Sequence, residues 1–411
     1  MNRHRELLII ILLITLILLS LYADVNFRVV TYNVLNFSYD SGIARYDYFQ
    51  SVVEAIEPDV VLLQEMINQE GADLFLDILN SNGDEFDAAD FIDGYYTDNM
   101  LYYRTSIVTF ISQDTIQTSL RDISEYVLSI GDNPIRFYTC HLKASQGSSN
   151  EQQRLEEVTI LRNRLNLLPE DTEFIIAGDM NFYTSSEPAY QKLIADEGDN
   201  GRAEDLIDEV GDWHDNPVYA PVHTQSTRTT QFGGGASGGM DDRFDFIFAS
   251  YGINDSIGID YIEDTYTSFG NDGNHLNQSI NAGTNSAVPA DIADALYYAS
   301  DHLPVYADFV SFGSTSSHEE EITHSPLTKT FLGFNYPNPF NPITNIRFDI
   351  KENESGTLLI YNTKGQFIES HQFEAGQHNF SWNAENQSSG VYFYKLQTES
   401  FTETRKMILL K

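Results

Sequence analysis

The sequence predicts an α/β main body followed by a smaller all-β unit, and three observations support this prediction. Apolar, β-prone runs alternate with helical segments over residues 24–312. A stretch rich in Ser, Thr and Glu, residues 313–328, then reads as a linker. The remaining residues, 329–411, contain only short strand-like runs. Alternating strands and helices are typical of sheets covered by helices, whereas about 80 residues of short strands favour a β-sandwich.

The main body opens with an expected strand at 27–32 and a helix at 48–56 that stops before Pro58. Residues 151–168 place apolar side chains close to one helical face, and Pro169 ends that helix. Apolar or β-branched runs predict further strands at 59–64, 100–110, 135–142, 173–177, 243–249 and 303–310. A glycine-rich loop, 232–242, allows two interpretations: a mobile flap near a site, or a flexible surface loop.

The tail unit has six expected strands separated by turn signals such as Lys364-Gly365 and Ser389-Gly390. They lie at 346–350, 356–362, 367–370, 379–382, 391–397 and 406–410.

Polar side chains follow the ends of several β-prone runs in the main body. These are Asn33, Glu65, His141, Asp179 with Asn181, and Asp301 with His302, while Asp245 lies inside the expected strand at 243–249. Strands that each deliver a carboxylate, amide or imidazole at one end can build a metal-assisted centre for phosphoester cleavage, because a hard cation such as Mg²⁺ prefers oxygen ligands and neutralises phosphate charge. No Gly-x-Ser-x-Gly elbow for acyl transfer and no His-Glu-x-x-His zinc motif occurs.

Each of these residues has an expected role. Glu65 is the best metal ligand, Asn33 assists through its carbonyl, and Asp301 supplies a second carboxylate. Asp179 and Asn181 contact water, metal or phosphate. His302 is the general base, and Asp245 fixes its tautomer. His141 donates to a phosphoryl oxygen or protonates the leaving group.

As a set, these segments resemble the endonuclease/exonuclease/phosphatase superfamily, whose fold is DNase I-like. The resemblance spans roughly residues 26–310 and is carried by Thr31-Tyr32-Asn33, Gln64-Glu65, His141-Leu142-Lys143, Gly178-Asp179-Met180-Asn181, Arg243-Phe244-Asp245 and Ser300-Asp301-His302. It implies a four-layer α/β/β/α sandwich that hydrolyses phosphoric esters with Mg²⁺, with Mn²⁺ or Ca²⁺ as alternatives. Extracellular nucleic acid is the expected substrate. A phospholipid phosphodiesterase of the sphingomyelinase type, a small-molecule phosphatase and a non-catalytic binding module are the alternatives.

The tail resembles a type A sorting domain of the bacterial type IX secretion system. The resemblance rests on Phe334 to Pro342, Gly390 to Leu396 and the final Lys406 to Lys411. It implies passage through the outer membrane, then release or surface attachment, with the secretion machinery as the expected partner. No stable protein partner is predicted otherwise. From the residues alone, a small carbohydrate- or partner-binding β-module remains the alternative.

Residues 1–23 are typical of an export signal, with Arg3 and Arg5 preceding an apolar run of about 15 residues, shorter than the ~20 that span a bilayer. An uncleaved N-terminal anchor is the alternative. Cys140 is the only cysteine, which excludes an intramolecular disulfide, and we expect a buried, inert thiol.

Charge is concentrated in the main body: residues 24–312 carry 13 basic and 49 acidic residues, a net charge of −36. Such a field disfavours tight, non-specific DNA binding, which depends on Lys and Arg. The basic residues expected nearest to a phosphate are Arg104, Lys143 and Arg154, with surface charge as the alternative. Tyr95-Tyr96 allows base stacking, but core packing is the expectation.

Overall fold

The computed structural model divides into two compact units, one ending at Ser316 and the other starting at Ser317. It describes residues 24–169, 172–207, 209–231, 233–313, 330–336, 340–351 and 353–411. The expected signal segment and most of the expected linker lie outside these residues. Among the described helices, none has both the length and the apolar character needed to cross a bilayer.

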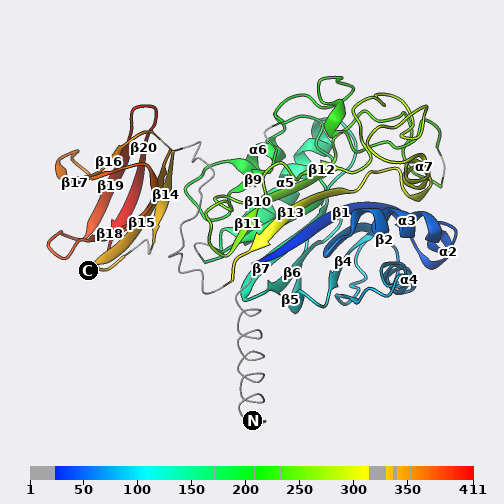
Figure 1. Ribbon diagram of the computed structural model, residues 1–411, viewed down its shortest axis with the longest axis horizontal. Coiled ribbons are helices and arrows are strands. Elements are labelled where there is room, and N and C mark those ends of the chain that lie inside the picture. The colour runs from blue at the N-terminus through cyan, green and yellow to red at the C-terminus, as the bar shows by residue number, and fades with distance from the viewer. Residues whose placement is uncertain are drawn as a thin grey trace, which may run out of the picture. The chain divides into compact units, whose positions relative to one another are not determined.

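Two β-sheets form the centre of the first unit (Figure 1). The described strands of the first sheet are β1 (Val25–Phe37), β2 (Val60–Met66), β3 (Phe86–Ala88), β4 (Asp98–Arg104), β11 (Ile259–Tyr261), β12 (Thr267–Ser268) and β13 (Val305–Ser311), in the order β11-β13-β1-β2-β4-β3 with β12 beside β13. Those of the second are β5 (Val108–Ile116), β6 (Ile123–Ile130), β7 (Asn133–His141), β8 (Phe174–Asp179), β9 (Ala203–Asp205) and β10 (Asp245–Ser250), in the order β5-β6-β7-β8-β10-β9.

Helices cover the outer faces of both sheets, so the unit has four layers, as the resemblance implied (Figure 1). Beside the first sheet lie α2 (Tyr39–Ile43), α3 (Tyr46–Ile56), α4 (Gln69–Leu79) and α7 (Ala290–Ala299). Beside the second lie α5 (Ser148–Leu165) and α6 (Pro188–Ile194), and a short 3₁₀ turn, η1, spans Ala220–Val222.

Strand β1 shows how the sequence produces these layers. Successive side chains of a strand point to opposite faces of the sheet. Phe27 and Val29 therefore enter the apolar core between the two sheets, together with Ile175 of β8. Val30 and Tyr32 face the other way, into the core beneath α3 and α4. Because both faces are buried, the strand reads as a nearly continuous apolar run.

One expected strand was wrong. Residues 100–110 are not continuous: β4 ends at Arg104, and β5 begins at Val108 in the other sheet. A turn closed by the Ile107 N–H donating to the Arg104 carbonyl carries the chain between the sheets. Sequence propensity could not mark this crossing, because both halves are β-prone.

Gly178 is required by close packing inside the second sheet. Its φ is +147°, and a Cβ there would lie 2.0 Å from the carbonyl oxygen of Cys140 on β7. We expect Gly178→Ala to destabilise the fold by more than the roughly 1–3 kcal/mol of backbone strain alone, since the neighbouring backbone must also move. Chemical denaturation measures this. Gly147→Ala, at φ +105° with open space around it, is the strain-only control; equal losses for both variants would contradict the packing argument.

The second unit is all-β, as expected. Its described strands are β14 (Phe331–Tyr336), β15 (Ile343–Ile350), β16 (Gly356–Asn362), β17 (Phe367–Phe373), β18 (Gly376–Asn383), β19 (Gly390–Gln397) and β20 (Thr402–Leu409). They form sheets of order β14-β15-β18 and β17-β16-β19-β20, with one shared apolar core that contains Trp382 and Tyr394.

Candidate active site

Strand register brings most of the predicted site residues to one end of the sandwich. In the second sheet, His141 of β7 pairs with Asp179 of β8, which pairs in turn with Asp245 of β10. These three residues therefore form one row across adjacent strands. In the first sheet, β1 and β2 are parallel, with Asn33 opposite Gln64, so that Asn33 and Glu65 lie together at their carboxyl ends.

Residues of both sheets meet in a polar centre. The Asn33 amide nitrogen donates to Glu65 Oε1 at 3.1 Å and to Asp179 Oδ2 at 3.0 Å. His141 Nε2 lies 3.5 Å from the same Asp179 oxygen and 4.0 Å from Glu65 Oε1. The side-chain oxygen of Asn33 accepts from the Leu35 N–H at 3.0 Å. Asn33 thus bridges the two carboxylates through its nitrogen, and the expected carbonyl contact to a metal stays a prediction.

His302 and Asp245 form a buried dyad. His302 Nδ1 lies 2.8 Å from Asp245 Oδ2, and Nε2 lies 3.7 Å from Asp179 Oδ2. Burial lowers the pKa of His302, but the negative charges of Asp245 and Asp179 outweigh burial and hold the pKa well above its usual value. The Nδ1 contact fixes the ring orientation and leaves Nε2 facing the polar centre.

Asp179 contacts most of the other residues of the site. Burial raises the pKa of its carboxyl group to about 7, opposed mainly by the charge of His302. Asn181, in a left-handed conformation with φ +53°, donates from its backbone and side-chain nitrogens to Asp179 Oδ1 at 3.1 and 2.8 Å. His141 has a pKa well below its usual value, because of burial and the nearby Arg121 charge, and is therefore neutral.

Asp301 makes a different contact from the one expected. Its Oδ2 accepts from the backbone N–H of Ala236 at 2.5 Å, and a Cβ on Gly235 would lie 2.7 Å from the same oxygen. The glycine-rich loop thus lies beside His302, near the site, and its mobility stays a prediction. Metal ligation by Asp301 stays a prediction.

The expected phosphate-binding cations were mostly wrong. Arg104 pairs with Asp59 and Asp84, at the opposite end of β2 and β4 from Glu65. Arg154 is fully buried and pairs with Glu187. Lys143 Nζ donates to the Ala144 carbonyl at 2.7 Å.

Sequence reasoning missed Arg121 and Gln225. Arg121 donates from Nε to the His141 carbonyl at 2.9 Å and from Nη2 to the Leu142 carbonyl at 2.8 Å. Gln225 Nε2 lies 2.5 Å from His302 Nε2. Gln225 follows η1 in irregular backbone, so no strand-end pattern marks it in the sequence.

The oxygen-rich centre fits a hard divalent cation. Asp179 is buried, and the positively chargeable groups in contact with it are the imidazoles of His141 and His302. Buried carboxylates without Lys or Arg partners are costly unless a cation compensates them. A second group of potential ligands lies close by: His214, Asp241 and Asp242 bring one ligand atom each within 4.8 Å of one another, and the Asp242 N–H donates to the Gln225 carbonyl.

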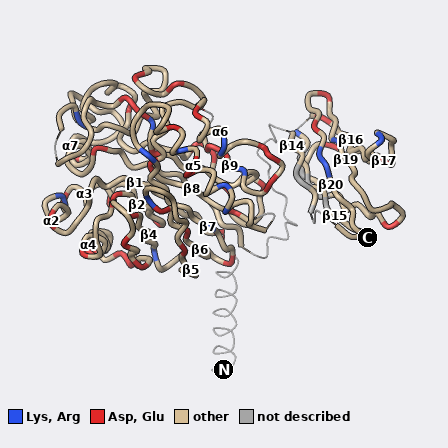
Figure 2. Tube along the Cα trace, turned by 180° about the vertical axis from the view of Figure 1, so that it is seen from behind, with Lys and Arg blue, Asp and Glu red and all other residues tan. Residues whose placement is uncertain are grey.

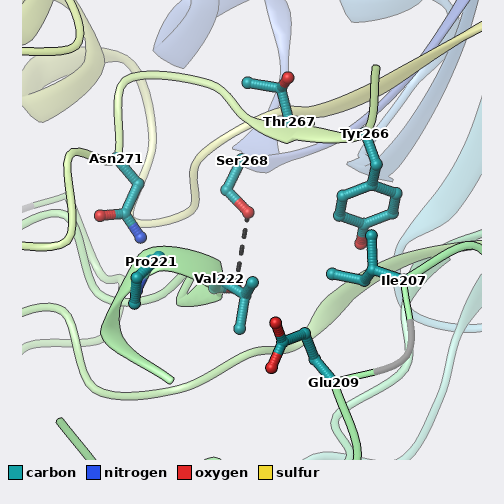
Figure 3. Close-up of a pocket in the computed structure, with 8 residues that line it drawn as sticks. All are labelled: Ile207, Glu209, Pro221, Val222, Tyr266, Thr267, Ser268 and Asn271. Carbon is teal, nitrogen blue, oxygen red and sulfur yellow. Dashed lines mark hydrogen bonds between the residues drawn. The ribbon is translucent and has the colours of Figure 1, made fainter. Parts of the chain in front are cut away.

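Figure 3 shows a further pocket of the first unit. Its lining residues are Ile207, Glu209, Pro221, Val222, Tyr266, Thr267, Ser268 and Asn271. The Tyr266 hydroxyl donates to the backbone carbonyl of Asp245 at 3.3 Å. None of the predicted site residues lines this pocket, so it is separate from the polar centre.

A His–Asp dyad next to paired carboxylates and amides suits the chemistry of one class of protein, the phosphoric ester hydrolases. Residues 30–302 match the model of the Endonuclease/Exonuclease/phosphatase family, and the chain belongs to this family. Its enzymes generally depend on divalent metals and act on nucleic acid or other phosphodiester substrates. Residues 335–410 match the Secretion system C-terminal sorting domain, which indicates export to the cell surface or medium through the secretion machinery.

No curated protein matches the chain. The chain is similar to several solved structures, three of which follow. A humanized D. rerio TDP2 is 20% identical, with a TM-score of 0.46 over 69% of this chain and 98% of its own. An endonuclease/exonuclease/phosphatase from Beutenbergia cavernae is 15% identical, with a TM-score of 0.44 and coverage of 93% and 100%. The human Nocturnin catalytic domain with a bound sulfate anion is 14% identical, with a TM-score of 0.42 and coverage of 71% and 97%.

Proposed function

We propose that the first unit is a secreted, Mg²⁺-dependent phosphodiesterase that hydrolyses extracellular nucleic acid. The observation that carries this proposal is the row of His141, Asp179 and Asp245 on adjacent strands, met from the other sheet by Glu65. This arrangement offers a base, a carboxylate pair and a neutral imidazole around one point.

His302 is the proposed general base. The carboxylates of Asp245 and Asp179 hold its pKa well above the usual value, so we propose that the positive charge of a cation bound at Glu65 and Asp179 would lower this pKa and leave Nε2 able to accept a proton. Because Nδ1 faces Asp245, the proton of an attacking water is accepted at Nε2, and Asp245 stabilises the imidazolium that forms. Gln225 lies at Nε2 and has to yield that position to the water. Asn181 holds Asp179 in place, and the neutral His141 donates from Nε2 to a phosphoryl oxygen.

The carboxylates of Glu65 and Asp179 are the proposed cation ligands. When bound, a divalent cation offsets their charge and polarises the phosphoryl oxygen. We expect EDTA to abolish hydrolysis and excess Mg²⁺ to restore it, measured as release of acid-soluble nucleotide. Mn²⁺ and Ca²⁺ tested at matched concentrations identify the preferred ion. Full activity in EDTA would overturn the metal-dependent mechanism.

Substrate class is tested by comparing plasmid DNA, RNA, sphingomyelin and a simple phosphomonoester with Mg²⁺ in moderate salt. We expect cleavage of polynucleotide. Figure 2 shows acidic residues along many loops of this unit and few basic ones, and the resulting repulsion of polyanions weakens with salt. Activity should therefore rise from low to moderate ionic strength. Cleavage of lipid without cleavage of polynucleotide would favour the sphingomyelinase-type alternative.

A further inference from the structure

We propose that Tyr95 and Tyr96 form a stacking platform for an unpaired nucleobase beside the active site, so that the preferred substrate is single-stranded nucleic acid. This inference rests on the proposed function and specifies its substrate class.

Both rings are unusually exposed. Tyr95 is 72% and Tyr96 66% exposed, more than any other exposed aromatic side chain in the described part of the chain. The expected core packing was therefore wrong. The two rings contact each other edge to face, with centroids 5.1 Å apart. Paired aromatic faces in solvent lose the free energy that burial would supply, about 25 cal/mol per Å², so they mark a binding surface.

Backbone strain accompanies this exposure. Tyr96 has φ +76°, a left-handed conformation that costs a non-glycine residue roughly 1–2 kcal/mol. Such strain gathers at ligand-binding positions, where the surrounding structure holds it. A hydrogen bond closes the loop that carries both tyrosines, because the Gly94 N–H donates to Asp98 Oδ1 at 2.9 Å. A Cβ on Gly94 would lie 3.7 Å from Asp122 Oδ2, so this loop also lies close to Asp122.

The platform lies at the catalytic end of the sandwich. Tyr96 precedes β4 by two residues, and Asp98, the first residue of β4, pairs with Met66, which directly follows Glu65. The segment between β5 and β6 ends in Arg121 and Asp122. Arg121 binds the carbonyl oxygens of His141 and Leu142, and Asn99 on β4 donates to the Asp122 carbonyl at 3.0 Å, so this segment connects the start of β4 with the strand end that carries His141.

Arg121 supplies a cation between the rings and the centre. Burial lowers its pKa, while the negative charges of Asp179, Glu65 and Glu157 act in the opposite direction, and a guanidinium stays charged at neutral pH. A phosphate attracted to Arg121 would bring its attached base towards the tyrosines.

Stacking also explains how an acidic protein could bind a polyanion. With a net charge of −36 over residues 24–312, the unit cannot gain affinity from many phosphate contacts. Stacking on an aromatic side chain contributes about 1–3 kcal/mol per base and needs no basic residue. Bases are available for stacking in a single strand but not in a duplex, and the choline headgroup of sphingomyelin has no aromatic plane to stack.

The test compares two single-stranded DNA substrates of equal length, one with normal bases and one with abasic tetrahydrofuran residues. For the Tyr95→Ala/Tyr96→Ala variant with Mg²⁺, we expect the loss of kcat/KM on the base-containing strand to exceed the loss on the abasic strand by about 10-fold, mainly through KM. Tyr95→Phe/Tyr96→Phe, which keeps both rings, should recover most of this difference. Tyr251→Ala controls for loss of a tyrosine elsewhere, because Tyr251 follows the end of β10 remote from Asp245.

Each outcome separates this inference from the proposed function. Equal losses on the two strands, or none, would overturn the platform while leaving the phosphodiesterase intact. A wild-type protein that cleaves neither strand with Mg²⁺ would instead contradict the proposed nuclease function. Thermal melting of the Tyr95 and Tyr96 variants should match that of the wild type, because both rings are on the surface.

Discussion

Replacing Asp179 with asparagine is expected to reduce kcat by about 10³-fold or more while the fold persists. The side chain keeps its shape, but the negative charge that faces His302, His141 and the amide of Asn33 disappears. Removal of one preorganised electrostatic group from an active site typically costs about 10²–10³-fold, and loss of a metal ligand adds to this. The measurement is single-turnover hydrolysis with saturating Mg²⁺.

The same Asp179→Asn substitution that lowers activity should leave the stability of the fold unchanged or raise it. Because burial raises the pKa of Asp179 to about 7, its ionised form is disfavoured in the folded state relative to the unfolded chain. In EDTA at pH 8, above that value, Asp179→Asn should melt at the same temperature as the wild type or higher. Asp308→Asn is the control. It removes the ion pair between Asp308 on β13 and Arg28 on β1, so this variant should lose stability but keep its activity. Activity near the wild-type level in Asp179→Asn would remove the proposed centre.

Replacing His302 with alanine is expected to cause the second large loss of activity. General base catalysis contributes roughly 10²–10⁴-fold, so kcat should fall by that factor with little change in KM. Added imidazole should restore part of the rate, because the cavity left beside Asp245 accommodates the missing ring. His378→Ala, in the second unit, serves as the histidine control.

The dyad predicts a non-additive result. His302 and Asp245 act through one contact of 2.8 Å, so Asp245→Asn combined with His302→Ala should lose little more than His302→Ala alone. Independent, multiplied losses would show that Asp245 acts on something other than His302.

Much of the site was predictable because its residues end β-prone runs. Glu65, His141 and Asp179 terminate buried strands, and parallel or adjacent strands bring their ends to one edge of a sheet. The four-layer architecture was implied only by the resemblance, whereas the all-β tail followed from its short strands and turn signals.

Other parts of the site could not be predicted in this way. The sequence did not show that Asp301 accepts from the backbone N–H of Ala236, 65 positions earlier in the chain. Gln225 meets His302 across 77 positions from irregular backbone. Propensity and periodicity describe neighbours in sequence, and neither reports which distant hydrogen-bond partner a buried polar group acquires.

By itself, the sequence determined which residue types end the strands and therefore which chemistry they offer: carboxylates, amides and imidazoles suited to phosphoester hydrolysis. Only the tertiary structure decided where each side chain points, that Arg104 is ion-paired at the opposite strand end, that Arg154 is buried against Glu187, and that Tyr95 and Tyr96 face solvent. The reason is physical: strand formation follows local pattern, whereas burial and pairing depend on which segments packing brings together.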